Sequence, residues 1–182
     1  MNRRQMLMLA PLAAAGAVGV AFLAMLHGEE NGSFDPRGVP SMLIGKRVPA
    51  FSLPGIAGAG LSDADLHAPP QPLLVNFFAS WCVPCVQEAP VLMSLHRAGI
   101  DLFGIAYKDQ DPAVTAFLAR QGDPFTRVAA DAPGRVAIDW GVTGVPETFL
   151  LDRQGIVRWH FAGPLTPEIV ANQLTPALKH AA

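Results

Sequence analysis

Trp81-Cys82-Val83-Pro84-Cys85 contains both cysteines of this 182-residue chain, and its spacing decides how the rest of the sequence is interpreted. A disulfide requires Cα atoms about 4.4 to 6.8 Å apart, and positions i and i+3 in the first turn of a helix meet this requirement. Two cysteines are too few for a disulfide scaffold, so the C-x-x-C arrangement predicts redox chemistry.

The two cysteines are expected to have different roles. Cys82 would lie at the N-terminal end of a helix, where the dipole and free N–H groups favour a thiolate, and Cys85 would lie one turn deeper. Cys82 would then attack a target disulfide, and Cys85 would resolve the mixed disulfide. The product is a Cys82–Cys85 disulfide, and no separate cofactor is expected.

A zinc site is the main alternative use of a C-x-x-C pair, and it needs two further ligands. The sequence has no second C-x-x-C, and its histidines are dispersed without ligand spacing. We therefore expect no metal. A purely structural disulfide is also disfavoured, because closing so short a loop constrains the unfolded chain little.

The segments around the cysteines alternate between short apolar runs and amphipathic stretches, as α/β proteins do. Residues 73–78 are apolar except for Asn76, which is typical of a central strand buried on both faces. A helix should begin at Cys82, with Pro84 in its first turn. Further strands are expected at 50–53, 101–107, 125–129, 148–151 and 156–161, and further helices at 111–120, capped by Asp111, at 133–140 and at 166–179. This order predicts a central mixed β-sheet flanked by helices within residues 42–182.

The N-terminal region has the features of a membrane anchor. Residues 6–26 carry no charge, and a helix of that length spans about 32 Å, the hydrocarbon thickness of a bilayer. Arg3 and Arg4 precede this stretch and Glu29 and Glu30 follow it, so residues 1–5 are expected in the cytoplasm. Residues 27–41, rich in polar residues, would form an extracytoplasmic tether to the domain at 42–182.

Two alternatives to an uncleaved anchor exist for this region. A cleaved signal peptide has a shorter apolar part followed by small residues, and the small residues at 13–15 come too early for that. The Arg3-Arg4 pair also fits a weak twin-arginine export signal.

The amino-acid composition excludes several functional and structural classes of protein. Thirteen basic residues against 15 acidic ones give a net charge of −2 with no basic run, so nucleic acid is not an expected partner. With 51% apolar and 15% charged residues, the chain is too hydrophobic for a disordered tail and can bury one ordinary core.

The motifs at 78–85 and Gly144-Val145-Pro146 together resemble the thioredoxin fold. Further stretches at 35–41, 43–46, 107–109 and 141–150 are similar to the CcmG/DsbE branch, the membrane-anchored thiol:disulfide interchange proteins of cytochrome c maturation. The resemblance covers about residues 35 to 165. It implies a thioredoxin-like α/β fold preceded by one N-terminal transmembrane helix, with Pro146 as a cis-proline facing the disulfide.

The same resemblance implies a reductant in a bacterial inner membrane, with its soluble domain in the periplasm. Its target would be the haem-attachment cysteines of apocytochrome c or a partner thiol protein, and a DsbD- or CcdA-type membrane donor would re-reduce it. A broader reductase of the TlpA/ResA kind and a non-enzymatic module that binds apocytochrome are the alternatives. A DsbA-like oxidase and a peroxiredoxin are disfavoured by the motifs.

Two acids are candidates for the site. Glu88 follows Cys85 by three residues, and the resemblance places an acid there that would accept the Cys85 proton, although helical acids are usually only solvated. Glu147 follows Pro146 and should border the active-site groove, where it would tune a thiol pKa unless it is a capped or exposed strand residue.

The remaining candidates line the groove for a target chain. Val83, Pro84 and Val145 flank the cysteines and the proline. Trp81 would either contact the target or pack in the core. Asn76 occupies the place of the buried acid of thioredoxin, a departure that argues against a general thioredoxin.

Overall fold

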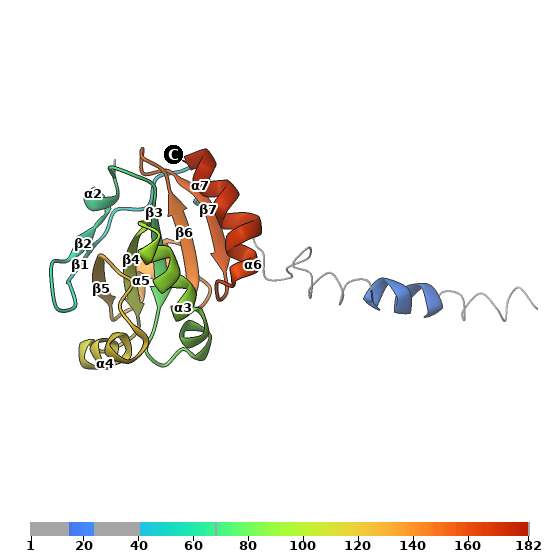
Figure 1. Ribbon diagram of the computed structural model, residues 1–182, viewed down its shortest axis with the longest axis horizontal. Coiled ribbons are helices and arrows are strands. Elements are labelled where there is room, and N and C mark those ends of the chain that lie inside the picture. The colour runs from blue at the N-terminus through green and yellow to red at the C-terminus, as the bar shows by residue number, and fades with distance from the viewer. Residues whose placement is uncertain (1–14, 24–40, 68, 182) are drawn as a thin grey trace, which may run out of the picture. The chain divides into compact units, whose positions relative to one another are not determined.

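The computed structural model describes residues 15–23, 41–67 and 69–181 (Figure 1). Met1–Val39 and Pro40–Ala182 are two separate compact units. In the first unit, residues 15–23 are helical, whereas the predicted cytoplasmic residues 1–5, most of the anchor 6–26 and nearly all of the tether 27–41 lie outside the described residues. None of the described helices is both long and apolar enough to cross a membrane.

The second unit is built on one five-stranded mixed sheet in the order β5-β4-β3-β6-β7. The strands β3 and β4, and β4 and β5, are parallel, while β6 is antiparallel to both β3 and β7. This confirms the predicted mixed sheet. The strands are β3 (Leu73–Phe78), β4 (Asp101–Tyr107), β5 (Arg127–Asp131), β6 (Glu147–Leu151) and β7 (Val157–Ala162).

Helices cover both faces of this sheet, and α6 and α7 lie on its β7 side (Figure 1). The helices are α2 (Asp63–Leu66), α3 (Val83–Arg97), α4 (Asp111–Gln121), α5 (Arg135–Asp139), α6 (Pro167–Ile169) and α7 (Thr175–Ala181). A π-helical segment, η1 (Val170–Leu174), joins α6 to α7. A short antiparallel pair, β1 (Ser52–Leu53) with β2 (Leu61–Ser62), precedes them.

Several predicted boundaries differ from the structure. Gln110 is the N-cap of α4 in extended conformation, so Asp111 is the first helical residue and not the cap. A carboxylate there still favours the helix, because it lies in the first turn. Strand β5 begins at Arg127 rather than at 125, and β2 and α2 were not predicted, since elements this short carry almost no periodic signal.

The alternation of side chains along β3 assigns the core to the two faces of the sheet. All six residues of β3 are buried, as predicted. Leu73, Val75 and Phe77 belong to the cluster that includes α5, while Leu74 and Phe78 pack against α3, α4 and the C-terminal helices. Asn76 therefore lies on the α3 face of the sheet, in the middle of apolar side chains.

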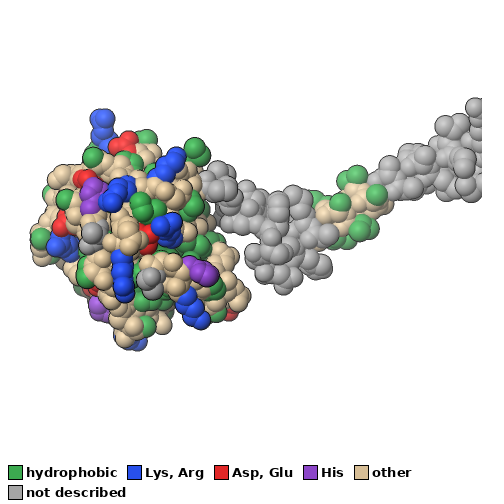
Figure 2. Space-filling model, turned by 90° about the horizontal axis from the view of Figure 1, so that it is seen from above, with side chains coloured by type: hydrophobic (Ala, Val, Ile, Leu, Met, Phe, Trp, Pro, Cys, Tyr) green, Lys and Arg blue, Asp and Glu red, His purple; other side chains and the backbone are tan. Residues whose placement is uncertain are grey.

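The surface of the second unit carries charges of both signs. On the face shown in Figure 2, basic and acidic side chains are interspersed with apolar ones rather than gathered by sign. The larger apolar side chains of the four other strands are mostly buried, whereas Trp159 and Phe161 of β7 are half-buried. Trp140, with 1% of its surface exposed, meets the rings of Phe77 and Phe149 edge to face, with centroid distances of 5.2 and 5.1 Å.

Replacing Trp140 by alanine is expected to lower the free energy of unfolding by about 3–5 kcal/mol, because the side chain is large and its neighbours cannot fill the cavity. The control is Ile138→Ala, also near α5 but with 66% of the residue exposed, which should change stability by about 0.5 kcal/mol or less. Urea unfolding followed by circular dichroism measures both. Equal losses for the two variants would contradict this description of the core.

Candidate active site

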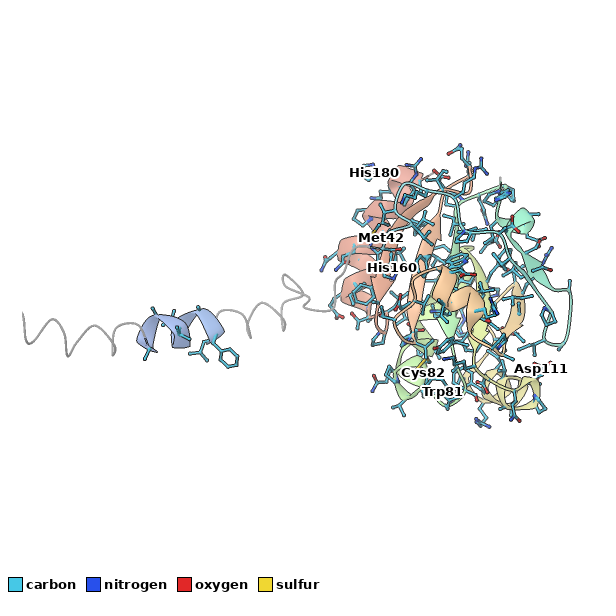
Figure 3. The ribbon with its side chains drawn as sticks, turned by 180° about the vertical axis from the view of Figure 1, so that it is seen from behind. Met42, Trp81, Cys82, Asp111, His160 and His180 are labelled. Carbon is cyan, nitrogen blue, oxygen red and sulfur yellow. A yellow bond between two sulfur atoms is a disulfide. The ribbon has the colours of Figure 1, made fainter. Side chains whose placement is uncertain are left out.

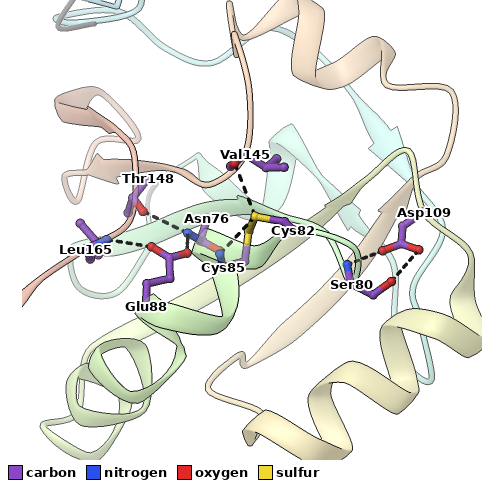
Figure 4. The surroundings of a disulfide bond; sticks show 9 residues. All are labelled: Asn76, Ser80, Cys82, Cys85, Glu88, Asp109, Val145, Thr148 and Leu165. Carbon is purple, nitrogen blue, oxygen red and sulfur yellow. Dashed lines mark hydrogen bonds between the residues drawn. A yellow bond between two sulfur atoms is a disulfide. The ribbon is translucent and has the colours of Figure 1, made fainter. Parts of the chain in front are cut away.

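The two cysteines meet where the chain leaves β3 and enters α3 (Figure 4). They form a disulfide with a Cα separation of 5.3 Å, which confirms the pairing predicted from their spacing. Cys82 is the N-cap of α3, and its sulfur accepts a hydrogen bond from the backbone N–H of Cys85 at 3.1 Å. One N–H group of the first helical turn thus points at the sulfur of Cys82, which together with the helix dipole favours a thiolate there after reduction.

The loop before β6, residues 143–146, also lies beside the disulfide. The Val145–Pro146 peptide bond is cis, which confirms the cis-proline that the resemblance implies. The carbonyl oxygen of Val145 lies 3.5 Å from the sulfur of Cys82. Pro146 is buried and Val145 is half-buried, so the loop forms a wall beside the nucleophilic sulfur.

Glu88 is a buried acid, not a solvated surface one. It is 0% exposed, and its carboxylate accepts hydrogen bonds from the side-chain amide of Asn76 and the backbone N–H of Leu165, each at 3.0 Å (Figure 4). Burial raises the pKa of Glu88 to about 7, although both hydrogen bonds act in the opposite direction. A carboxyl group with such a pKa can both accept and release a proton near neutral pH.

Glu88 and Cys85 share a small internal cavity. Its volume is about 10 Å³, about that of one water molecule, and Asn76 also lines it. The amide nitrogen of Asn76 donates to both Glu88 and Thr148, while its oxygen is buried without a partner among the described residues. Asn76 therefore orients the Glu88 carboxylate, and both side chains line the same cavity as Cys85.

Glu147 lies elsewhere than expected. It pairs with Phe77 across the sheet, and both belong to the face opposite the one that carries Asn76 and Glu88. The residue is 1% exposed and bonds to Thr143, Gly144 and His160, so it braces the loop from behind and does not border the groove. Burial alone would raise its pKa, but the hydrogen bonds from His160 and Thr143 outweigh burial and hold the Glu147 pKa below its ordinary value.

Exposed apolar side chains surround the disulfide. Trp81 and Val83 are 58% and 68% exposed, and Figure 3 shows Trp81 next to Cys82 at one end of the sheet. The indole N–H of Trp81 donates to the carbonyl oxygen of Lys108 at 3.3 Å. This placement excludes the core interpretation of Trp81. Pro84 is half-buried, and Val86, which we did not predict, is 39% exposed one turn after Val83.

A contact between Ser80 and Asp109, which the sequence did not predict, fixes the segment before Cys82. The carboxylate of Asp109 accepts hydrogen bonds from the backbone N–H and the hydroxyl group of Ser80 (Figure 4). Asp109 belongs to the stretch at 107–109 that carried the resemblance, but nothing in the sequence indicated its partner. The contact ties the cysteine segment to the turn after β4.

Comparisons with known proteins agree with this geometry. The Redoxin family matches residues 43–175. The chain belongs to the Redoxin family. The thiol:disulfide interchange protein HelX of Rhodobacter capsulatus is 42% identical over 168 residues, which are 92% of each chain. A DsbE homolog of Paracoccus denitrificans is 40% identical over 182 residues, 100% of this chain and 98% of the relative.

Solved structures give the same result for the fold. A thiol:disulfide interchange protein of the thioredoxin family from Chlorobium tepidum superimposes with a TM-score of 0.59 at 28% identity, covering 74% of this chain and 94% of that one. The fold is therefore thioredoxin-like. With the disulfide at the start of α3, the protein is a thiol:disulfide oxidoreductase of the DsbE and HelX type.

The raised pKa of Glu88 predicts a specific pH dependence of stability. Between its ordinary pKa of 4.5 and about 7, the folded state holds a proton that the unfolded state releases, so stability falls as pH rises through this window and levels off above it. Glu88→Gln should remove this component, a difference of about 2 kcal/mol between pH 5 and pH 8.

Urea unfolding of the oxidised protein at several pH values measures this difference. The control is Glu168→Gln, which neutralises an exposed carboxylate with a lowered pKa and should leave the fall in place. Parallel stability curves for wild type and Glu88→Gln would show that Glu88 titrates as an ordinary acid.

Proposed function

We propose that this oxidoreductase acts as a periplasmic reductant in cytochrome c maturation. Its targets are the haem-attachment cysteines of apocytochrome c or a partner thiol protein. The observation that carries the proposal is the arrangement at α3, where the sulfur of Cys82 lies at the helix terminus and the buried carboxyl group of Glu88 lines the same small cavity as Cys85. The similarity to the DsbE and HelX proteins supports the proposed role in cytochrome c maturation.

The reaction begins from the reduced cysteine pair. The Cys82 thiolate attacks one sulfur of the target disulfide, forming a mixed disulfide and releasing the other target cysteine as a thiolate that takes up a proton. The Cys85 thiol then transfers its proton to Glu88 and attacks the sulfur of Cys82. The second target cysteine leaves as a thiolate that takes up the proton released by Glu88, so the target gains two electrons and two protons while the Cys82–Cys85 disulfide forms.

Glu88 is suited to the second step because it is on the same helix as Cys85 and shares a cavity with it. Its pKa of about 7 lets it accept the proton during attack and release it afterwards. The exposed side chains of Trp81, Val83 and Val86, together with Val145, would contact the apolar part of an unfolded target chain.

The protein also needs a source of electrons, because the periplasm is oxidising. We propose that a DsbD- or CcdA-type membrane donor reduces the Cys82–Cys85 disulfide after each cycle. The uncharged stretch at 6–26 would anchor the chain in the bacterial inner membrane as a single span and keep the soluble domain close to that donor. No nucleic acid takes part.

A Cys85→Ser variant should accumulate a mixed disulfide with its target, because Cys82 can attack but nothing resolves the product. We expect apocytochrome c or its thiol partner in the trapped species, identified by mass spectrometry under non-reducing conditions. Cys82→Ala is the control and should trap nothing. Recovery of many unrelated secreted proteins would instead indicate a broad reductase, and intact cytochrome maturation with Cys82→Ala would indicate a binding module.

Glu88→Gln should slow the resolution step by about 10²-fold or more, because Cys85 then has no proton acceptor. The formation of the mixed disulfide by Cys82 should stay within about twofold of wild type, since Glu88 bonds to Asn76 and Leu165 rather than to Cys82. Rapid acid quenching followed by electrophoresis separates the two steps. An equal effect on both steps would contradict the assignment of Glu88 to Cys85.

A further inference from the structure

The carboxylate of Glu147 connects two elements that are distant in sequence. Its Oε1 atom accepts three hydrogen bonds from the loop, at 2.7 Å from the N–H of Thr143, 2.8 Å from the Thr143 hydroxyl and 3.1 Å from the N–H of Gly144. Its Oε2 atom lies 2.7 Å from Nε2 of His160 on β7. One carboxylate therefore holds the loop on one side and a histidine on the other.

His160 is fixed where it stands. Its side chain is 9% exposed, that of Glu147 is 2% exposed, and the imidazole lies over the ring of Phe149 with a centroid distance of 4.4 Å. Figure 3 shows His160 well separated from Cys82 and Trp81. His160 consequently acts on the reaction only through the residues that it contacts.

The loop that Glu147 holds is the one beside the nucleophile. Thr143 and Gly144 are exposed, a Cβ atom added at Gly144 would meet nothing within 4 Å, and the next residue places its carbonyl oxygen 3.5 Å from the sulfur of Cys82. This backbone is therefore close enough to Cys82 to contact a target chain bonded to that sulfur.

We propose that His160 is a positioning residue for thiol:disulfide exchange. By donating Nε2–H to Glu147, it fixes the carboxylate that holds Thr143 and Gly144, and it thereby sets the backbone against which the target chain lies. The inference rests on the disulfide exchange at Cys82 and holds for any peptide target, so it does not depend on the role in cytochrome c maturation.

The physical reason is the cost of a buried carboxylate oxygen without a donor. A buried charged oxygen that has lost its hydrogen-bond donor destabilises the folded state, so without His160 the carboxylate would turn toward another donor or toward solvent. Glutamine carries an amide N–H at nearly the position of Nε2 and can keep the bond, whereas leucine fills the space without a donor.

The test compares two probes on the reduced full-length protein. The first is a short unstructured peptide whose single cysteine is disulfide-bonded to nitrothiobenzoate, and the second is the peptide-free dithiobis-nitrobenzoate reagent. Both release the same coloured thiolate when Cys82 attacks. The half-saturating concentration and the limiting rate are measured for wild type, His160→Leu and His160→Gln.

We expect His160→Leu to raise the half-saturating peptide concentration about tenfold, with its limiting rate and the rate with the peptide-free reagent within about twofold of wild type. His160→Gln should stay within about threefold of wild type on both probes. Thr143→Val removes only a hydroxyl donor at an exposed position and should also raise the half-saturating peptide concentration. This variant tests the proposal if His160→Leu does not fold.

Three results would overturn the proposal. The first is an equal loss by His160→Leu on both probes, which would mean a general structural effect. The second is a glutamine variant as defective as the leucine variant. The third is a wild-type protein that does not distinguish the peptide from the peptide-free reagent, which would show that the loop at 143–145 does not bind the target chain.

Discussion

The hydrogen bond from the N–H of Cys85 to the sulfur of Cys82 is the contact on which the rest of the site depends. It makes the sulfur of Cys82 the cap of α3, so that an N–H group of the first helical turn and the helix dipole also stabilise negative charge on that sulfur. The position of this cap is set by β3, which is buried along its whole length and paired on both edges. Strand β3 ends at Phe78, and the short segment 79–82 leads directly from it to the start of α3 at Val83.

Two buried acids lie on opposite faces of the sheet. Adjacent residues of β6 point to opposite faces, so Thr148 bonds to Asn76 beside Glu88, while Glu147 faces His160. Burial dominates at Glu88 and raises its pKa to about 7, whereas the hydrogen bonds dominate at Glu147 and keep it ionised. One carboxyl group is thus able to exchange protons, and the other is a fixed anchor for the loop.

The sequence alone was sufficient for the elements with strong local signals. Strands β3 and β4 have the predicted bounds, because each is almost entirely apolar, and the disulfide follows from the spacing of Cys82 and Cys85. The π-helical segment η1 and the short elements β2 and α2 escaped prediction, since none of them leaves a periodic pattern long enough to recognise.

Contacts between distant parts of the chain escaped prediction for a different reason. The buried carboxylate of Glu88 accepts a hydrogen bond from the N–H of Leu165, 77 residues later. The carboxylate of Glu147 is bonded to His160 in the neighbouring strand. The sequence names these residues but does not give the face on which each side chain lies. Glu147 was therefore expected at the groove although it lies behind the loop.

The equilibrium reduction potential of the Cys82–Cys85 disulfide tests the account most directly. It can be titrated in the full chain against glutathione or dithiothreitol and followed through the fluorescence of Trp81, which is exposed next to Cys82. If the protein is a reductant, its reduction potential should be no higher than that of the glutaredoxins, roughly −200 to −230 mV. A value near the roughly −120 mV of a strong oxidant would contradict the account and make the protein a disulfide-forming enzyme.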